Sequence, residues 1–294
     1  MTVEEEKLRQ AEAIETAAPK DEKKPKEKIK LGRDTKDKGE PLLRAEHVSE
    51  VFGGLKAVSD FNFEIYPGEL VGLIGPNGAG KTTAFNMFTG VYEPTDGSIE
   101  FMGKSIAGLK PYEITKRGIA RTFQNIRLFS ELSVLDNVKI GFHAHHKAGI
   151  LESILRVGRY YSEEKRITRE AKRLLSIFHL DGLANETAKN LPYGAQRRLE
   201  IARALATKPH LLLLDEPAAG MNPQETQELM DMIRWIRDEF ALSVLLIEHD
   251  MKLVMGICEG IAVLNYGRII AKGTPDEIRN NPVVIEAYLG KEDE

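Results

Sequence analysis

Residues 75–82 of this 294-residue chain, GPNGAGKT, constrain its fold more than any other stretch, because they match the phosphate-binding pattern G-x-x-x-x-G-K-[ST] at every fixed position. The apolar run Leu70–Ile74 precedes them and predicts a buried parallel strand, while Lys81–Phe88 predicts a helix that ends at Gly90. A strand, a glycine-rich loop and a helix in this order direct backbone N–H groups and the positive helix end at an anion. The sequence therefore predicts a site for a nucleoside triphosphate.

The loop residues predict the two cofactors of such a site, ATP and Mg²⁺. Lys81 supplies a positive charge for the β and γ phosphates, and the hydroxyl of Thr82 is an oxygen ligand of the kind that Mg²⁺ prefers. The glycines let the backbone curl around phosphate oxygens without a Cβ in the way. The residues expected to contact the nucleotide are Gly75, Pro76, Asn77, Gly78, Ala79, Gly80, Lys81, Thr82 and Thr83.

Polar residues follow two further apolar runs. Asp215, in LLLLDE, would end a strand and hold Mg²⁺ directly or through water, and Glu216 would orient and polarise the attacking water. His249 follows LSVLLIE and is expected to hydrogen-bond the γ phosphate in the transition state. Gln124, in TFQN, is expected to bind Mg²⁺ or water in one state and to release it in another, which would couple the nucleotide to movement of a helical segment. The predicted catalytic set is Lys81, Gln124, Glu216 and His249, and the predicted metal ligands are Thr82, Gln124 and Asp215.

The first half of the chain predicts an antiparallel β subdomain and a helical subdomain. Strands around Leu43–Phe52 and 57–65, followed by a hairpin at 97–102, indicate the antiparallel part. From about residue 126 to 191 the pattern is helical and a stop is expected at Gly182. One apolar face of this segment is formed by Ile167, Ala171, Leu174, Leu175 and Phe178.

An α/β pattern resumes after residue 210. Residues 211–214 and 242–247 are apolar enough for buried strands, and between them Asn222, Pro223 and Glu225 form a capping box with a first-turn proline. The positions of this helix expected to face inward are Leu229, Ile233, Ile236 and Phe240. The alternation implies an α/β fold with a RecA-like P-loop NTPase core, a mostly parallel sheet and a site along its carboxyl edge.

Composition divides the chain into two regions. Residues 20–38 contain nine Lys or Arg, five Asp or Glu and two large apolar residues, too few apolar groups to offset the entropy of ordering. We expect residues 1–40 to be a disordered charged extension, either simply solvated or touching anionic lipid headgroups. Residues 41–294 are expected to form one nucleotide-binding domain.

Several classes of protein and site are not expected. No apolar run approaches the ~20 residues of a membrane-spanning helix, so any membrane role would come through partners. The net charge of -4 argues against a general nucleic-acid binder. The single Cys258 permits no internal disulfide. His143, His145 and His146 do not predict a metal site, because a helix places only two of them on one face.

Five motifs together resemble those of ATP-binding cassette (ABC) ATPases in order and spacing: GPNGAGKT, the glutamine of TFQNIRLF, LPYGAQRR, LLLLDEPAAGMNP and IEHDM. From about residue 42 to 290 the chain resembles the ATP-binding subunits of branched-chain amino acid importers. The similarity is strongest in AAGMNP, in IEHDMKLVMGI and in the tail GTPDEIRNNPVVIEAYLG. The resemblance implies an ATPase that couples ATP-driven dimerisation of cassettes to transport.

The resemblance further implies a head-to-tail dimer in which each ATP lies between the phosphate loop of one cassette and the signature segment of the other. By this comparison the signature segment is residues 191–196, and Tyr193 and Gly194 would contact the partner's ATP. The chain departs from the general pattern LSGGQ at Pro192, where a serine hydroxyl is usual, and at Tyr193 and Ala195. Phe52 matches the aromatic residue that stacks on adenine, and Ala219 and Gly220 match a loop at the dimer interface.

The partners implied are a second cassette, either a related subunit or a second copy, two transmembrane permease subunits and, indirectly, an extracytoplasmic amino-acid-binding protein. The cassette would then lie peripherally on the cytoplasmic face of the plasma membrane, with no nucleic acid bound. Apolar Ile126, Leu128 and Phe129, beside Gln124, are expected to receive a coupling helix of the permease. The alternatives are a cassette for lipid or lipopolysaccharide export and a non-transport ATP-dependent switch.

Overall fold

A computed structural model describes residues 39–145 and 159–289 of the chain. The expected charged extension therefore lies almost entirely outside the described residues, as does His146. The division of the chain into domains stays a prediction.

The central sheet contains six strands in the order β10 (Arg268–Gly273), β9 (Gly260–Asn265), β3 (Leu70–Ile74), β8 (Ser243–Ile247), β7 (Leu211–Asp215) and β6 (Ile119–Arg121). All neighbours pair in parallel except β10, which is antiparallel to β9. Ile247 lies opposite both Asp215 and Leu73 in the register. The residues that follow β3, β7 and β8 therefore leave the sheet at one edge.

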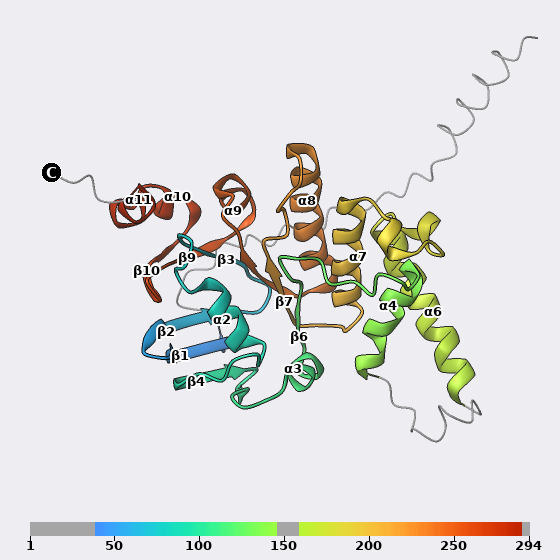
Figure 1. Ribbon diagram of the computed structural model, residues 1–294, viewed down its shortest axis with the longest axis horizontal. Helices are drawn as coiled ribbons and strands as arrows, with labels where there is room; N and C mark the ends of the chain where they lie inside the picture. Colours follow the sequence, from blue (N-terminus) through green and yellow to red (C-terminus); the bar gives the residue numbers. More distant parts are fainter. Residues whose placement is uncertain (1–38, 146–158, 290–294) are drawn as a thin grey trace, which may run out of the picture. The chain divides into compact units, whose positions relative to one another are not determined.

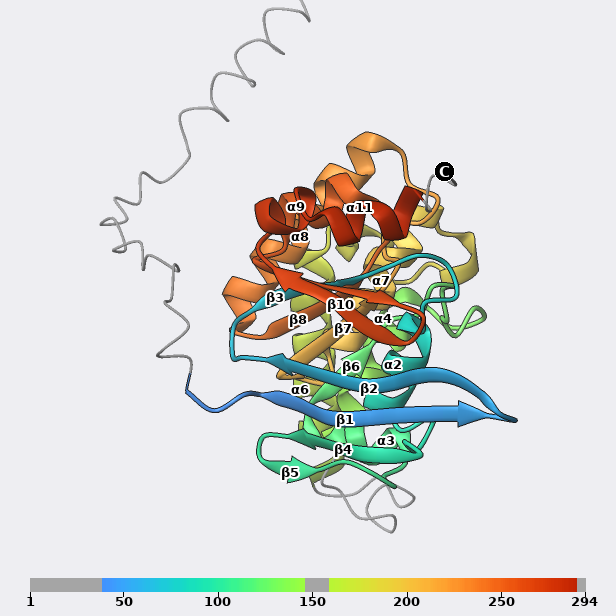
Figure 2. The same cartoon turned by 90° about the vertical axis from the view of Figure 1, so that its left-hand side faces the viewer.

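Side chains along the central strands point alternately into two hydrophobic cores, one on each face of the sheet. Leu212, Leu214 and Leu246 belong to the core formed with helices α7 (Tyr193–Leu205), α8 (Pro223–Phe240) and α9 (Met251–Ile257). Leu213 and Leu245 belong to the core formed with α2 (Lys81–Phe88) and the second sheet. Successive strand residues point to opposite faces, so a strand covered on both sides has to be apolar throughout. Figure 2 shows α8 and α9 on one side of the central sheet and β1 (Leu43–Phe52), β2 (Leu55–Ile65) and β4 (Asp96–Phe101) on the other.

The second sheet is antiparallel, in the order β2 (Leu55–Ile65), β1 (Leu43–Phe52), β4 (Asp96–Phe101) and β5 (Lys104–Ser105). It contains the strands and the hairpin that the sequence predicts. Phe61 and Phe63 of β2 contact Phe88 of α2, with ring centroids 6.1 and 6.3 Å apart. The aromatic contacts fix this sheet against the helix that follows the phosphate loop.

Figure 1 labels the described α-helices, which are α2 (Lys81–Phe88), α3 (Pro111–Arg117), α4 (Val134–Phe142), α6 (Arg159–Ile177), α7 (Tyr193–Leu205), α8 (Pro223–Phe240), α9 (Met251–Ile257), α10 (Pro275–Arg279) and α11 (Pro282–Leu289). The described residues also form the 3₁₀ turns η1 (His143–His145), η2 (Asp181–Leu183) and η3 (Ala188–Asn190). Contacts join α4, α6 and α7 to one another. Within the described residues, no helix combines the length and apolar character needed to cross a bilayer.

The apolar faces of two helices agree with the sequence prediction, with two exceptions. The predicted face of α6 is buried, but this helix ends at Ile177 rather than at Gly182, because His179 already adopts a left-handed conformation with φ 54°. Asn222 caps α8 as predicted, accepting from the backbone N–H groups of Gln224 and Glu225. The last residue of α8, Phe240, is exposed rather than inward and lies edge-on to Trp235.

Candidate functional site

The phosphate loop, residues 75–82, connects β3 to α2 and has a backbone that only glycine fits at two points. Gly75 has φ 152° and Gly80 has φ 103°; a Cβ on Gly75 would lie 2.0 Å from the carbonyl oxygen of Leu264, and one on Gly80 2.5 Å from that of Ala57. The carbonyl of Ala79 accepts from Gly267 N–H at 2.9 Å. The loop is therefore fixed against the β9–β10 hairpin and against the start of β2.

The C-terminal helix also reaches this loop. The Tyr288 hydroxyl accepts a hydrogen bond from the backbone N–H of Gly75, although burial makes the net effect on the pKa of Tyr288 an increase. A cavity of about 490 Å³ lies between the phosphate loop and this helix. Its wall includes Pro76 and Asn77 from the loop and Val283 from the helix. Residues far apart in the sequence thus form one surface around the loop.

Lys81 is the first residue of α2 and is 8% exposed. Its Nζ donates to the carbonyl oxygens of Gly75 at 2.6 Å and Pro76 at 3.0 Å. Burial lowers the pKa of Lys81, and the charges of Glu216 and Asp215 oppose this shift. The ammonium group of Lys81 therefore lies inside the curve of the phosphate loop and is influenced by the charges of both acids. A terminal phosphate bound in this loop would contact the lysine there.

Glu216 is the point at which three of the predicted residues meet. Its Oε2 accepts from Gln124 Nε2 at 2.7 Å and lies 3.6 Å from His249 Nδ1. Its backbone is left-handed, with φ 45°, a conformation that costs a non-glycine residue roughly 1–2 kcal/mol. The hydrogen bond from Glu216 N–H to Ile247 O, at 2.9 Å, ties this strained turn to β8.

Asp215, the last residue of β7, is paired with a residue that the sequence analysis missed. Arg121 Nη2 lies 2.7 Å from Asp215 Oδ2, both side chains are 7% exposed, and Arg121 Nη1 also donates to Asn86 at 2.7 Å. The hydroxyl, carboxylate and amide oxygens of Thr82, Asp215 and Gln124 fit the preference of Mg²⁺ for oxygen ligands. An ion held there would share the aspartate with Arg121 or displace the guanidinium.

Glu248 is a second residue that the sequence did not single out. It is 1% exposed; its Oε1 accepts from Ala218 N–H at 2.9 Å and its Oε2 from His249 N–H at 3.2 Å. Burial raises the pKa of Glu248. The Glu248 carboxylate therefore links two backbone segments, the one that follows Asp215 and Glu216 and the one at His249. Its only signal in the sequence was a polar residue ending an apolar run.

The predicted adenine and signature residues lie outside this cluster. Phe52 is 41% exposed, and its ring lies edge-on to Tyr92 with centroids 5.0 Å apart. Tyr193 is 44% exposed at the start of α7, and its ring faces Gly220, the small residue expected at the interface loop. The described contacts of the signature residues are with α7, α8 and Gly220 rather than with the phosphate loop of the same chain.

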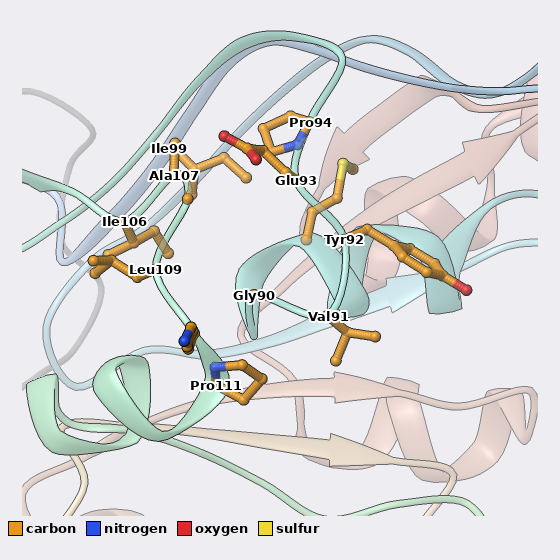
Figure 3. Close-up of a pocket in the computed structure, with 13 residues that line it drawn as sticks. Gly90, Val91, Tyr92, Glu93, Pro94, Ile99, Ile106, Ala107, Leu109 and Pro111 are labelled. Atoms are coloured by element: carbon orange, nitrogen blue, oxygen red, sulfur yellow. The ribbon is translucent and has the colours of Figure 1, made fainter.

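Two further hollows flank the core. One of about 510 Å³ is lined by Phe123, Leu128, Phe129 and Ile140, among others, and thus contains two of the three residues predicted to receive a coupling helix. The other, of about 200 Å³, lies where α2 ends, away from the phosphate loop, and is lined in part by Tyr92 (Figure 3). No group of three or more His, Cys, Asp or Glu side chains suited to a metal occurs in the part of the chain that the structure describes.

Comparison with known proteins identifies the family. The model of the ABC transporter family matches residues 58–219, which include the phosphate loop, Gln124, the signature segment and the acidic pair. This chain belongs to the ABC transporter ATP-binding family. ATP binding and an ATPase fold follow from that membership, and the predicted fold class is confirmed.

Curated relatives match the cassette over nearly their whole length. The branched-chain amino acid transport protein LivG of Escherichia coli K12 is 48% identical over 252 residues, which cover 86% of this chain and 99% of LivG. BraF of Pseudomonas aeruginosa is 46% identical, covering 85% and 98%. The lipopolysaccharide export protein LptB of E. coli is 35% identical, also covering 85% and 98%.

Two further comparisons concern the tail and the fold. A family model described as branched-chain amino acid ATP-binding cassette transporter matches residues 268–294. The crystal structure of the ADP conformation of an ATP-binding cassette of an ABC transporter has a TM-score of 0.74 and 30% identity, covering 86% of this chain and all of that one. The nucleotide-free form of a cassette gives the same TM-score at 31% identity.

Proposed function

We propose that this ABC cassette hydrolyses ATP to drive the import of branched-chain amino acids. The observation that carries the proposal is the 48% identity to LivG over 99% of that protein, against 35% to LptB. The match of the branched-chain family model to the tail supports the same cargo. Lipopolysaccharide or lipid export is the alternative, and a non-transport switch acting on nucleic acid has no support in the net charge of -4.

In the proposed mechanism, two cassettes close head-to-tail on ATP. The partner is a LivF-like subunit or a second copy of this chain. The phosphate loop and Lys81 hold the phosphates, Phe52 stacks on adenine, and Tyr193 and Gly194 contact the ATP of the partner cassette. Thr82, Asp215 and Gln124 would hold Mg²⁺, which neutralises charge on the phosphates when it is bound.

The hydrolytic step assigns different roles to Glu216, His249 and Gln124. Glu216 accepts a proton from the attacking water, while His249 and Lys81 meet the charge that develops on the γ phosphate. The same Oε2 of Glu216 accepts a hydrogen bond from Gln124. Withdrawal of Gln124 would therefore free the base for the water, so the glutamine acts as a gate on hydrolysis.

The signature segment bears on the activity of the second composite site. Pro192 has no hydroxyl donor for the partner's ATP, which removes one contact worth about 1 kcal/mol net. Ala195 is 5% exposed and packs inward, so it offers no polar group there. We infer that the site completed by this segment turns over more slowly than one completed by an LSGGQ sequence.

The proposed partners are two transmembrane permease subunits at the cytoplasmic face of the plasma membrane, with an amino-acid-binding protein on the far side. The groove lined by Leu128 and Phe129 is the proposed seat of a permease coupling helix. Phe129 is 48% exposed at its rim, and Arg203 lies over its ring at 5.5 Å. An apolar groove with an exposed aromatic side chain is typical of a helix-docking surface.

Phe129→Glu should lower transport without weakening ATP binding. A buried charge at a docking surface is expected to lower transport by about tenfold or more, while ATP binding by the purified chain stays unchanged. The two expected results are checked by measuring transport by the reconstituted complex and binding of a fluorescent ATP analogue by the purified chain. Leu183→Glu, at an exposed leucine outside this groove, is the control. Transport at the native rate in Phe129→Glu would remove this surface from the proposal.

The cargo is tested on the full chain purified with its membrane subunits and reconstituted into vesicles. Leucine, isoleucine or valine, supplied with the co-purifying binding protein, should stimulate ATP hydrolysis. Stimulation of ATP hydrolysis by lipopolysaccharide instead would indicate an exporter rather than an importer. Binding to ribosomes or nucleic acid with no membrane subunit attached would favour the switch.

A further inference from the structure

A buried ion pair on α7 has no role in the proposed chemistry. Arg197 is 0% and Glu200 1% exposed, and Arg197 Nη1 donates to Glu200 Oε2 at 2.8 Å across one helical turn. Burying such a pair is costly unless further hydrogen bonds satisfy both groups. The remaining partners of the two side chains therefore show what the pair holds in place.

Both side chains bind the backbone of residues 123–127, which we call the glutamine segment. Arg197 donates to Phe123 O at 2.6 Å through Nη1 and to Gln124 O at 2.8 Å through Nη2. Glu200 Oε1 accepts from Arg127 N–H at 3.1 Å and from Phe123 N–H at 3.4 Å. The pair therefore forms hydrogen bonds with both carbonyl oxygens and N–H groups of the glutamine segment.

The glutamine segment has no regular secondary structure of its own. The strand β6 ends at Arg121, and the next helix, α4, begins at Val134. The side chains of α7 therefore supply hydrogen bonds that a sheet or helix would otherwise supply. Arg197 Nη2 also lies 3.3 Å from the Tyr193 hydroxyl, one turn earlier on α7, so the same guanidinium joins the glutamine segment to the signature segment.

We propose that Arg197 and Glu200 are positioning residues that make α7 and the glutamine segment move as one body. When the start of α7 engages the partner's ATP, the pair carries the backbone of Gln124 with it, and the Gln124 side chain leaves Glu216. The inference rests on the proposed roles of the signature segment, Gln124 and Glu216. It adds the mechanical link by which the second cassette permits hydrolysis in the first.

Arg197→Lys tests the link while keeping the buried charge paired. A single ammonium group can reach Glu200 and one carbonyl but cannot span both carbonyls as the planar guanidinium does. We expect ATP affinity to stay within about twofold and kcat to fall about tenfold at an unchanged KM. Arg237→Lys is the matched control, because Arg237 of α8 forms an ion pair with Glu259, and this variant should retain native kcat.

A double-mutant cycle with Gln124→Ala distinguishes positioning from a general loss of stability. If Arg197 acts through Gln124, Arg197→Lys should reduce kcat in the native background and have no further effect in Gln124→Ala. Equal effects in both backgrounds, or native kcat in Arg197→Lys, would overturn the inference. These rates are read from hydrolysis alone, so failure of the amino acid cargo would leave the result intact.

A second variant covers the case in which Arg197→Lys does not fold. Arg197→Met combined with Glu200→Met replaces the pair by apolar side chains of similar volume, a change that buried ion pairs often tolerate. Without the link, this variant should show the same loss of kcat and the same lack of effect in Gln124→Ala. Native turnover in the folded double variant would contradict the proposal.

Discussion

A Glu216→Gln variant is expected to bind ATP normally while hydrolysing it about a thousandfold more slowly than the native chain. Glutamine keeps the shape of the side chain and can still accept the hydrogen bond that Gln124 donates at 2.7 Å. It cannot accept a proton from water. Turnover therefore reports the base function alone, and the paired cassettes should accumulate as a closed, ATP-bound dimer.

Single-turnover hydrolysis and size-exclusion chromatography in the presence of ATP measure the two effects. Glu228→Gln, at an exposed acid of α8, is the control and should behave as the native protein. Hydrolysis by Glu216→Gln at the native rate would show that another group activates the water. Among the described residues, His249, whose Nδ1 lies 3.6 Å from Glu216 Oε2, would then be the next candidate base.

Lys81→Met should abolish tight ATP binding and, with it, hydrolysis. The lysine is buried within the loop, so its charge acts on phosphate through little intervening water, and hydrogen bonds to charged groups are the stronger ones. We expect the ATP dissociation constant to rise about a hundredfold. Titration with a fluorescent ATP analogue measures the change directly.

The same variant also removes the hydrogen bonds from Nζ to Gly75 and Pro76, so its fold needs to be checked. Circular dichroism and the thermal midpoint should stay close to those of Lys172→Met, a substitution on α6 far from the loop. ATP affinity like that of the native chain in Lys81→Met would mean that the loop binds phosphate through its backbone alone.

The fold and the positions of the main candidate site residues could be predicted from the sequence because their signals are local. LVGLI and LLLLD are apolar at every position, and that pattern suits only strands covered on both faces. Once those strands are parallel neighbours, Gly75, Glu216 and His249 have to emerge at the same edge. The meeting of Gln124 and His249 at Glu216 agrees with this expectation.

The residues that the sequence analysis missed are paired over long stretches of chain. Arg121 and Asp215 are 94 residues apart, and Arg197 and Gln124 are 73 apart. No periodicity or capping pattern joins positions at such separations, so a basic residue in LPYGAQRR reads as an exposed helix position. The left-handed backbone of Glu216 was also unpredictable, since nothing local requires φ 45° of a glutamate.

The contacts behind the phosphate loop bear on how subunits of this kind can be recombined. The tail that matches the branched-chain family model begins at Arg268, one residue after the Gly267 amide that donates to Ala79, and it ends beyond Tyr288, which accepts from Gly75. Exchanging this tail between transporters for different cargoes would therefore alter the support of the nucleotide as well. We therefore expect a hybrid with a borrowed C-terminus to inherit part of its ATP affinity from the donor.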